Sequence, residues 1–453
     1  MENSRLFAPV AELHAVGKLY TLASGEMPDR HGAPARAAWE IERLAVLRGW
    51  PAGETLGSEA LLRKKLRVSR ETLREAIRIV ESRGAMRMRR GRCGGLMLVQ
   101  PTIERTAASL AAYLRAAGFT AEQFDQSVRG LDQLLAWELA RKQGPLPPPE
   151  PHESVRHWLA RASGRHTYLV YISVLDRLAP RTATVETPPP ALERTIGLHD
   201  AGAIQRLLAT LPFAPACDNA GVTESGTSAQ AGTIAVKMIE RANARANAHL
   251  GNEASLCEEF DTSRSLVRQA LRILQDLDLI GVRLGRGGGY TLKQPSPIGV
   301  VRQVFAWLAA RNCCPLALNE LMWDLNAANL RLAGERLGAL PQAARERHCA
   351  EFDRIVGELR GQERFMRLQQ ALSEVAACPV IATLARCVVA YQARSYGDFP
   401  EQVPSPVFDR LESTVAIALR AGDIDLAERA LRTLQRRAYR RRLQTYGFAL
   451  TAE

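Results

Sequence analysis

The spacing of apolar residues predicts helices over most of this chain, interrupted twice by short strands. In residues 70–80, apolar side chains recur every three or four positions, which is the period of a helix with one buried face. These residues are Leu73, Ala76, Ile77 and Val80. The next segment, MRMRRGRCGGLMLVQP, alternates large apolar and basic residues around a glycine cluster and ends at Pro101. That pattern predicts a hairpin of two short strands.

The same pattern occurs a second time. The stretch VSRETLREAIRIV at 68–80 is matched by TSRSLVRQALRIL at 262–274. A shift of 194 residues aligns 58–98 with 252–292 without a gap. The second apolar stripe consists of Val267, Ala270, Leu271 and Leu274. A second hairpin is predicted in IGVRLGRGGGYTLKQP, and we infer an internal duplication because chance does not preserve spacing over such a length.

The long region after each hairpin also has helical periodicity. It begins with SLAAYLRAAG in the first half and with LNELMWDLNAANLRLAGERL in the second. Between the halves lies PFAPACDNAGVTESGTSAQAG, which is poor in large apolar residues and has the composition of a linker. The predicted order is an N-terminal arm (1–36), a small domain (37–101), a helical domain (102–213), a linker (214–230), a second small domain (231–295), a second helical domain (296–446) and a tail (447–453).

Polar positions on the repeated helix point to its chemistry. Ser58 is expected to cap a short helix in SEALLRKKLRV, and Ser69 to cap the helix that follows. Opposite each apolar stripe, arginines recur one turn apart: Arg70, Arg74 and Arg78, then Arg264, Arg268 and Arg272. Two short helices joined by a tight turn, the second with an arginine row, are typical of a helix that enters a DNA major groove.

Charge favours the same partner. The net charge of +12 and the pI near 9.6 indicate affinity for polyanions. Twelve lysines and arginines but only three glutamates lie between residues 63 and 92. A charge run is usually a solvated helix face, but one this unbalanced repels itself without a negative partner. The basic first helix adds Arg63 and Lys64 to the expected DNA contacts.

Composition also excludes some classes. A hydrophobic content of 46% and a charged content of 24% are typical of soluble globular proteins. No apolar run approaches the ~20 residues of a spanning helix, and the first residues lack a signal-peptide pattern, so we expect a cytoplasmic protein with no membrane partner. The eight cysteines form no CxxC pair, which argues against a zinc ribbon and favours reduced, mostly buried thiols.

The repeated segment resembles the winged helix-turn-helix of GntR-family bacterial transcription regulators. The shared residues are E-x-x-L, V/T-S-R-x-x-L/V-R-x-A-L/I-R-x-L/V and the G-R-x-G-G wing. The resemblance implies DNA contacts from the recognition helices at Ser69, Arg70, Thr72, Arg74, Ser263, Arg264 and Arg268. It implies wing contacts at Arg90, Gly91, Arg92, Arg286 and Gly287. A glycine-rich nucleotide-binding loop is the alternative interpretation of the wing, but such a loop would open a helix.

The second copy departs from the first. Ala60 and Ala254 stand where the family often has a DNA-contacting arginine. The basic RKKLR of the first copy is replaced by CEEFD at 257–261 in the second. We therefore expect weaker DNA binding by the second copy, at a half-site sequence that can differ from that of the first.

The helical regions resemble the FadR-type C-terminal domain, through RGLDQLLAWELA, the HWLARASG turn at 157–164 and the closing AIALRAGDIDLAERAL. This resemblance implies an effector and dimerisation module. Many such domains bind a divalent metal through an Asp-x3-His pair and two more histidines. Here Glu153 and His157 would stand at i and i+4 on one helix face, and Arg129 would be the buried arginine that faces a carboxylate or acyl effector. The second half has Glu320 and Asp353 at the corresponding places, so no metal is expected there.

The expected fold is mainly α, with two winged helix-turn-helix domains, each followed by an all-α helical-bundle effector and dimerisation domain, as an internal pseudo-dimer. The expected function is a transcription regulator that reads two operator half-sites in double-stranded DNA. No cofactor is expected, and Glu153 and His157 form a hydrogen-bonded pair if they bind no metal. Whether the chain also forms a homodimer stays open.

An alternative is an architectural DNA protein in which only the first winged helix contacts DNA while the second half mediates oligomerisation. An enzyme is not expected, because the chain has no nucleophile elbow, metalloprotease helix or dinucleotide fingerprint.

Overall fold

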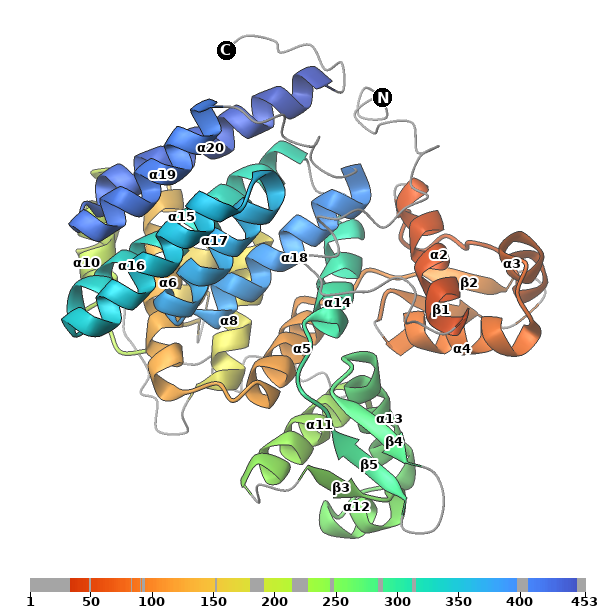
Figure 1. Cartoon of the computed structure of the whole chain (residues 1–453). Coiled ribbons are helices and arrows are strands. Elements are labelled where there is room, and N and C mark those ends of the chain that lie inside the picture. The colour runs from red at the N-terminus through yellow and green to blue at the C-terminus, as the bar shows by residue number, and fades with distance from the viewer. Residues whose placement is uncertain are drawn as a thin grey trace. The chain divides into compact units, whose positions relative to one another are not determined.

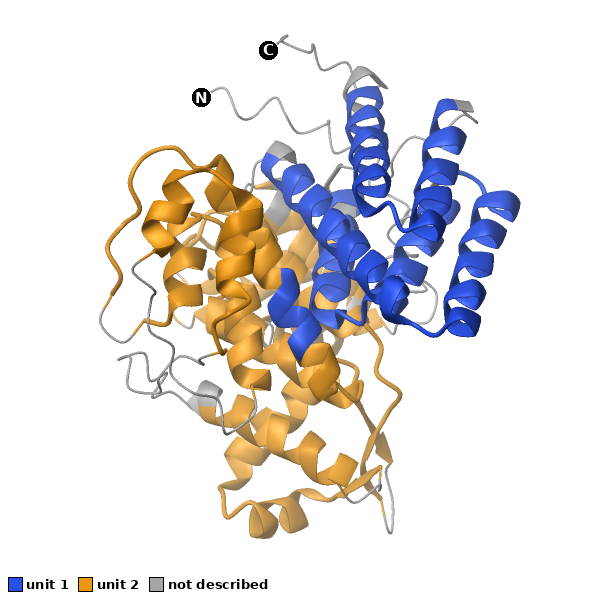
Figure 2. Cartoon of the chain, turned by 90° about the vertical axis from the view of Figure 1, so that its left-hand side faces the viewer, with its two compact units in different colours: residues 1–28, 125–130, 313–453 blue, residues 29–124, 131–312 orange. Residues whose placement is uncertain are grey.

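The fold of the computed structural model is mainly α, and its elements are labelled in Figure 1. The structure describes residues 33–48, 50–82, 84–89, 91, 94–150, 153–179, 191–213, 227–244, 248–283, 288–311, 315–396 and 406–445. Two compact units are coloured in Figure 2: unit 2 holds the described residues of 29–124 and 131–312, and unit 1 those of 125–130 and 313–453. No helix within these described ranges is long and apolar enough to cross a membrane.

Residues 33–98, here module 1, form three helices and a hairpin in unit 2. The helices are α2 (Ala33–Leu47), α3 (Glu59–Leu66) and α4 (Arg70–Ser82). The strands β1 (Met86–Arg89) and β2 (Gly95–Leu98) pair antiparallel, as the sequence predicts. The hydroxyl of Ser58 accepts a hydrogen bond from Leu61 N, and that of Ser69 from Thr72 N, which confirms both helix caps. The predicted apolar stripe of α4 is buried in the core.

Residues 227–292, here module 2, have the same order of elements with one more strand. The helices are α11 (Thr227–Ala244), α12 (Glu253–Glu259) and α13 (Arg264–Asp276). The strands β3 (His249–Gly251), β4 (Ile280–Arg283) and β5 (Gly289–Leu292) form an antiparallel sheet in the order β3-β5-β4. The predicted stripe of α13 is buried, and the predicted hairpin is confirmed as β4 and β5.

The two hairpins need glycine at the same place. A Cβ atom on Gly95 would lie 2.6 Å from the carbonyl oxygen of Gly57, and one on Gly289 would lie 2.6 Å from that of Gly251. Neither backbone can move away without breaking the pairing of its strand, so a side chain is excluded at both positions. The glycine cluster therefore has a structural role at the loop end of each hairpin, where Gly95 pairs with Arg89 and Gly289 pairs with Arg283.

The helix after each module packs against the other module. The first, α5 (Ile103–Ala116), lies beside α11, and Ala112 belongs to the hydrophobic core of module 2. Asn243 of α11 donates a hydrogen bond to the carbonyl of Arg115 at 3.1 Å. In turn, α14 (Ile298–Ala309) places Phe305 edge-on to Trp39 of α2, with ring centroids 5.8 Å apart. Each of these two helices therefore connects the modules within unit 2.

Five further helices surround a buried arginine in unit 2, although residues 125–130 of the first of them belong to unit 1. They are α6 (Ala121–Arg141), α7 (Val155–Ala162), α8 (His166–Leu178), α9 (Leu192–Gly197) and α10 (Ala201–Leu208). Arg156 of α7 is 1% exposed and binds Asp132 of α6 through Nε at 2.8 Å and Nη2 at 3.0 Å. It also donates to the carbonyls of Leu208 and Pro212, at 3.0 and 3.1 Å. Arg156 thus joins α6 and α7 to the end of α10.

Unit 1 contains the remaining helices. They are α15 (Pro315–Ala339), α16 (Gln342–Glu358), α17 (Gly361–Ala376), α18 (Pro379–Tyr396), α19 (Pro406–Ala421) and α20 (Ile424–Thr445). One long helical pattern in the sequence spans both α19 and α20. In the structure the helix is interrupted at Gly422, whose φ is +79°. Asp423 then caps α20 by accepting from Leu426 N.

The four cysteines whose state the structure describes are free thiols: Cys257, Cys349, Cys378 and Cys387. All but Cys257 are buried. Burial raises the pKa of Cys387 to about 12, so this thiol stays protonated and unreactive at neutral pH.

Candidate nucleic-acid interface

Both repeated helices present an exposed row of arginines. On α4, the exposed fractions of the Arg70, Arg74 and Arg78 side chains are 63%, 50% and 58%. On α13, Arg264 is 68% and Arg268 52% exposed, and Arg272 is also exposed. The opposite face of each helix is the buried stripe, so each helix is fixed by its apolar side and offers positive charge on the other.

One glutamate holds two arginines in each module. In module 1, Glu59 accepts from Arg70 Nε at 3.3 Å and from Arg74 Nε at 3.2 Å. In module 2, Glu253 accepts from Arg264 Nε at 3.0 Å and from Arg268 Nε at 2.9 Å. Both glutamates are the first residue of the helix that precedes the arginine row.

These glutamates are functional candidates that the sequence analysis missed as site residues. The signal was present, because Glu59 and Glu253 fall on each other under the 194-residue shift and open the E-x-x-L phrase. Burial pushes the pKa of Glu253 upward, but hydrogen bonds and charge from Arg264 and Arg268 outweigh it and hold that pKa below its usual value. Glu253 is therefore ionised at neutral pH and orients both guanidinium groups.

Other predicted contact residues lie around the row. Arg63 and Lys64 are exposed on α3. Ser69 and Thr72 hydrogen bond to each other through their hydroxyls at 2.8 Å, and Ser263 caps α13 by accepting from Leu266 N. Gly91 is exposed at the hairpin tip with φ +114°. Four predicted wing residues lie outside the described residues: Arg90, Arg92, Arg286 and Gly287.

The two modules differ in charge at the helix before the arginine row. Three basic residues stand in the last turn of α3, whereas α12 ends with Glu258 and Glu259. Glu259 forms an ion pair with Arg241 of α11, while Glu258 is exposed. The electrostatic potential around the arginine row of module 2 is consequently less positive than that around the arginine row of module 1.

The proposed effector residues of the first half have partners within the protein. Glu153 binds Arg161 at 2.6 Å, and His157 binds Asp176 through Nε2 at 2.9 Å. The expectation that Glu153 and His157 share one helix face is wrong, because α7 begins at Val155 and Ser154 is its N-cap. Burial alone would raise the pKa of Glu153, but the hydrogen bond and positive charge of Arg161 together have the larger effect and hold that pKa below its usual value. The Glu153 carboxylate is therefore ionised.

Arg129 is not the buried arginine that the resemblance implies. Its side chain is 57% exposed, and its Nη2 lies 3.8 Å from Glu335 within unit 1. Glu153 and His157 belong to unit 2. The buried arginine of the first half is Arg156, and its guanidinium is already bound to Asp132.

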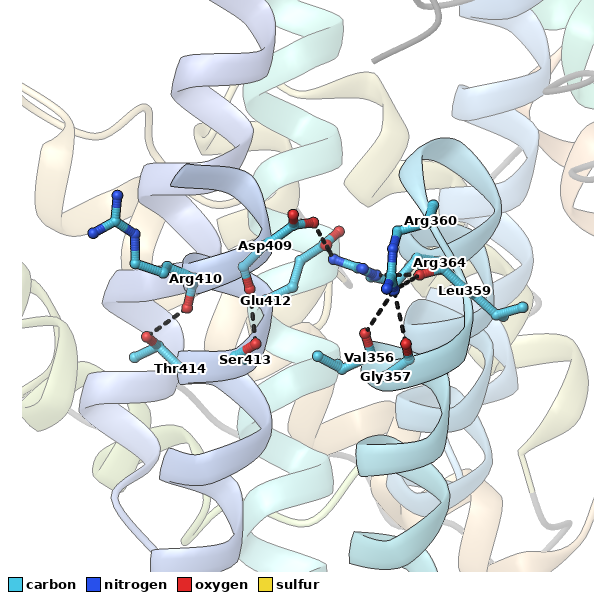
Figure 3. A network of polar contacts seen from close by, with 10 residues as sticks. All are labelled: Val356, Gly357, Leu359, Arg360, Arg364, Asp409, Arg410, Glu412, Ser413 and Thr414. Atoms are coloured by element: carbon cyan, nitrogen blue, oxygen red, sulfur yellow. Dashed lines mark hydrogen bonds and ion pairs between the residues drawn. The ribbon is translucent and has the colours of Figure 1, made fainter. Parts of the chain in front are cut away.

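Side chains of the second half also bind within the protein. Asp353 forms an ion pair with Arg420, and the Ser413 hydroxyl donates to the carbonyl of Asp409 at 2.8 Å. In the adjoining network (Figure 3), Arg364 is 2% exposed and binds Asp409 at 2.5 Å and Glu412 at 2.7 Å. Burial raises the pKa of Glu412, and Arg364 opposes that rise. The network ties α17 to α19.

Over the part of the chain that the structure describes, no three His, Cys, Asp or Glu side chains cluster closely enough to hold a metal ion.

Comparisons with known proteins add little. No protein-family model matches the chain, and no curated protein matches it. Among solved structures, E. coli McbR/YncC is similar over 43% of this chain and 87% of that chain, with 16% identity and a TM-score of 0.24. The function therefore has to follow from the geometry of this chain's own residues.

Proposed function

We propose that this chain is a sequence-specific DNA-binding transcription regulator of the GntR type, in which modules 1 and 2 are winged helix-turn-helix readers of two operator half-sites. The observation that carries the proposal is the exposed arginine row on a helix whose other face is buried, present in both modules. A helix of this kind, preceded by a short helix and followed by a hairpin, is the part of such folds that enters the major groove.

The matched geometry of the modules supports two readers derived by duplication. Glu59 and Glu253 hold equivalent arginine pairs, and Gly95 and Gly289 make equivalent close approaches. Gln303 of α14 donates to Ser109 of α5 at 3.3 Å, and these residues are 194 positions apart, the same interval as the repeat. Contact between equivalent residues is what a two-fold axis relating the halves would produce.

The test is to substitute the equivalent arginines separately. Once footprinting has identified a bound promoter fragment, Arg74→Ala and Arg268→Ala should each weaken binding about tenfold, because a base or phosphate contact contributes about 1–3 kcal/mol. Each should also shorten the footprint on one side. Arg354→Ala is the matched control, since Arg354 is 50% exposed and ion-paired on α16, far in sequence from both rows. Unchanged affinity in both variants would refute DNA reading by these helices.

The second candidate is an architectural protein in which only module 1 contacts DNA and the second half mediates oligomerisation. The acidic end of α12 favours this alternative. The same experiment separates the two: here Arg268→Ala leaves affinity and footprint length unchanged, whereas Arg74→Ala still weakens binding about tenfold.

We further propose a cytoplasmic, non-enzymatic protein whose helical regions sense a small carboxylate or acyl effector and support assembly, as an intramolecular pseudo-dimer or a homodimer.

A further inference from the structure

A cavity of about 310 Å³ lies within unit 1, between α15, α17 and α18. Its volume falls at the lower end of the range for sites that bind small molecules. It is distinct from the Arg364 network, which joins α17 to α19. It also contains none of the effector candidates that the sequence suggested.

Three of the lining side chains are buried carboxamides with free hydrogen-bonding atoms. Asn326, Asn329 and Gln369 are 4%, 3% and 9% exposed. The unpartnered atoms are Asn326 Nδ2, Asn329 Oδ1, and both Nε2 and Oε1 of Gln369. A buried polar atom without a partner destabilises the fold, so such a cluster needs a reason.

The orientation of Asn329 follows from its neighbour. The Ser373 hydroxyl has one proton, and it donates this proton to the backbone carbonyl of Gln369 at 2.8 Å. Ser373 must therefore accept from Asn329, whose Nδ2 lies 2.8 Å away. One Nδ2 proton of Asn329 is thus bound to Ser373, and its Oδ1 is left as an acceptor without a partner.

The rest of the lining sets the charge of an occupant. Phe365, Met366 and Val389 make apolar walls, and no acidic residue lines the cavity. Two arginines also line it, the exposed Arg367 and the half-buried Arg386. The deeply buried polar groups are thus uncharged donors and acceptors. They can hydrogen bond to an uncharged group of a ligand, but they do not offset the free-energy cost of removing a charged group from water.

We propose that this cavity binds a small organic molecule whose inner end is uncharged and carries both a hydrogen-bond donor and an acceptor, such as a primary carboxamide, a lactam or a nucleobase edge. The carboxamides of Asn326, Asn329 and Gln369 are its buried polar lining. This assignment is independent of DNA binding, and it places a ligand site in the half where the sequence suggested none.

The test uses the full chain and named probes. Nicotinamide, benzamide, uracil and hypoxanthine are compared with nicotinate and benzoate, the matched acids, by thermal unfolding at about 10 mM. At least one neutral probe should raise Tm by about 1–3 °C, and each amide should exceed its acid. Gln369→Leu should abolish the shift. Gln342→Leu, the same change at an exposed position of α16, should retain it.

A second measurement separates a binding role from a structural one. Because Gln369 has two unpartnered amide atoms, Gln369→Leu without ligand should be at least as stable as the wild type. Gln369→Glu keeps the shape of the side chain but adds a negative charge, and it replaces the leucine variant if that variant does not fold. The Tm shift on adding the probe should also be lost in Gln369→Glu. The proposal is overturned if no neutral probe raises Tm, if the acids match the amides, or if the shift survives both substitutions.

Discussion

At the scale of single residues, Glu59 and Glu253 give the arginine rows a defined shape. Each carboxylate accepts from two guanidinium groups that are half exposed or more. Ion pairs this exposed add little to stability, so their main consequence is to restrict where the arginines point. A restricted guanidinium loses less conformational entropy on binding, which favours one base sequence over others. The carboxylate also repels phosphate, which reduces binding to arbitrary DNA.

Glu59→Gln should therefore raise affinity for arbitrary DNA and lower the ratio of specific to non-specific affinity. We expect that ratio to fall by about tenfold, the size of one contact. Titration of the operator and of a scrambled duplex at one salt concentration measures it. Glu75→Gln is the matched control, because Glu75 has the same charge and binds Arg78 at 2.6 Å, outside the pair that Glu59 holds. An equal fall in both variants would mean that charge alone, without positioning, explains the effect.

At the scale of elements, a few buried polar contacts decide how the helices of unit 2 fit together. Arg156 is buried against Asp132, and it also donates to the carbonyls of Leu208 and Pro212, at and just beyond the end of α10. The partners come from residues 52 to 56 positions later in the chain. This single side chain therefore holds together elements whose apolar faces alone would tolerate several arrangements.

Arg156→Ala should lower the free energy of unfolding by about 3–5 kcal/mol, because it leaves the Asp132 carboxylate buried without a counter-ion. Chemical denaturation followed by circular dichroism measures the loss. The control is Arg161→Ala in the same helix, where the side chain is 28% exposed and the expected loss is about 1 kcal/mol or less. The double variant Asp132→Leu with Arg156→Leu should recover part of the stability. Equal losses for Arg156→Ala and Arg161→Ala would contradict this role.

The same scale shows which elements local sequence predicts. Both arginine helices and both hairpins were predicted. The helices have a strong apolar period and a capping serine, and the hairpins alternate apolar and polar residues around glycines and end at a proline. By contrast, only the helical character of the surrounding region was predicted for α18, and the bounds of this helix were not. The break between α19 and α20 was also missed, because one turn at Gly422 does not interrupt the apolar spacing.

At the scale of the whole molecule, one chain supplies two arginine surfaces, so the proposed DNA binding should depend steeply on salt. If the six arginines of the two rows each neutralise one phosphate, the slope of log affinity against log salt is about −5. The double variant Arg74→Ala with Arg268→Ala should reduce its steepness by about 2. Fluorescence anisotropy over a salt series gives both slopes. A wild-type slope near zero would contradict nucleic-acid binding altogether.

Local residues were sufficient to predict the helical class, the repeated pattern, the caps at Ser58 and Ser69, and the face on which each arginine row lies. All of these depend on interactions within a few positions along the chain, where period and side-chain type are enough. The same reasoning misplaced Glu153, because one residue decides whether a side chain precedes a helix or belongs to it.

Other features came only from the tertiary structure. They include the packing of α5 on module 2, the contact between Ser109 and Gln303, and the carboxamide cavity of unit 1. Each depends on side chains from distant parts of the chain meeting at a few ångströms. An apolar stripe says that a helix is covered but not by which partner, and an asparagine in a helix looks the same in sequence whether it faces water or a cavity.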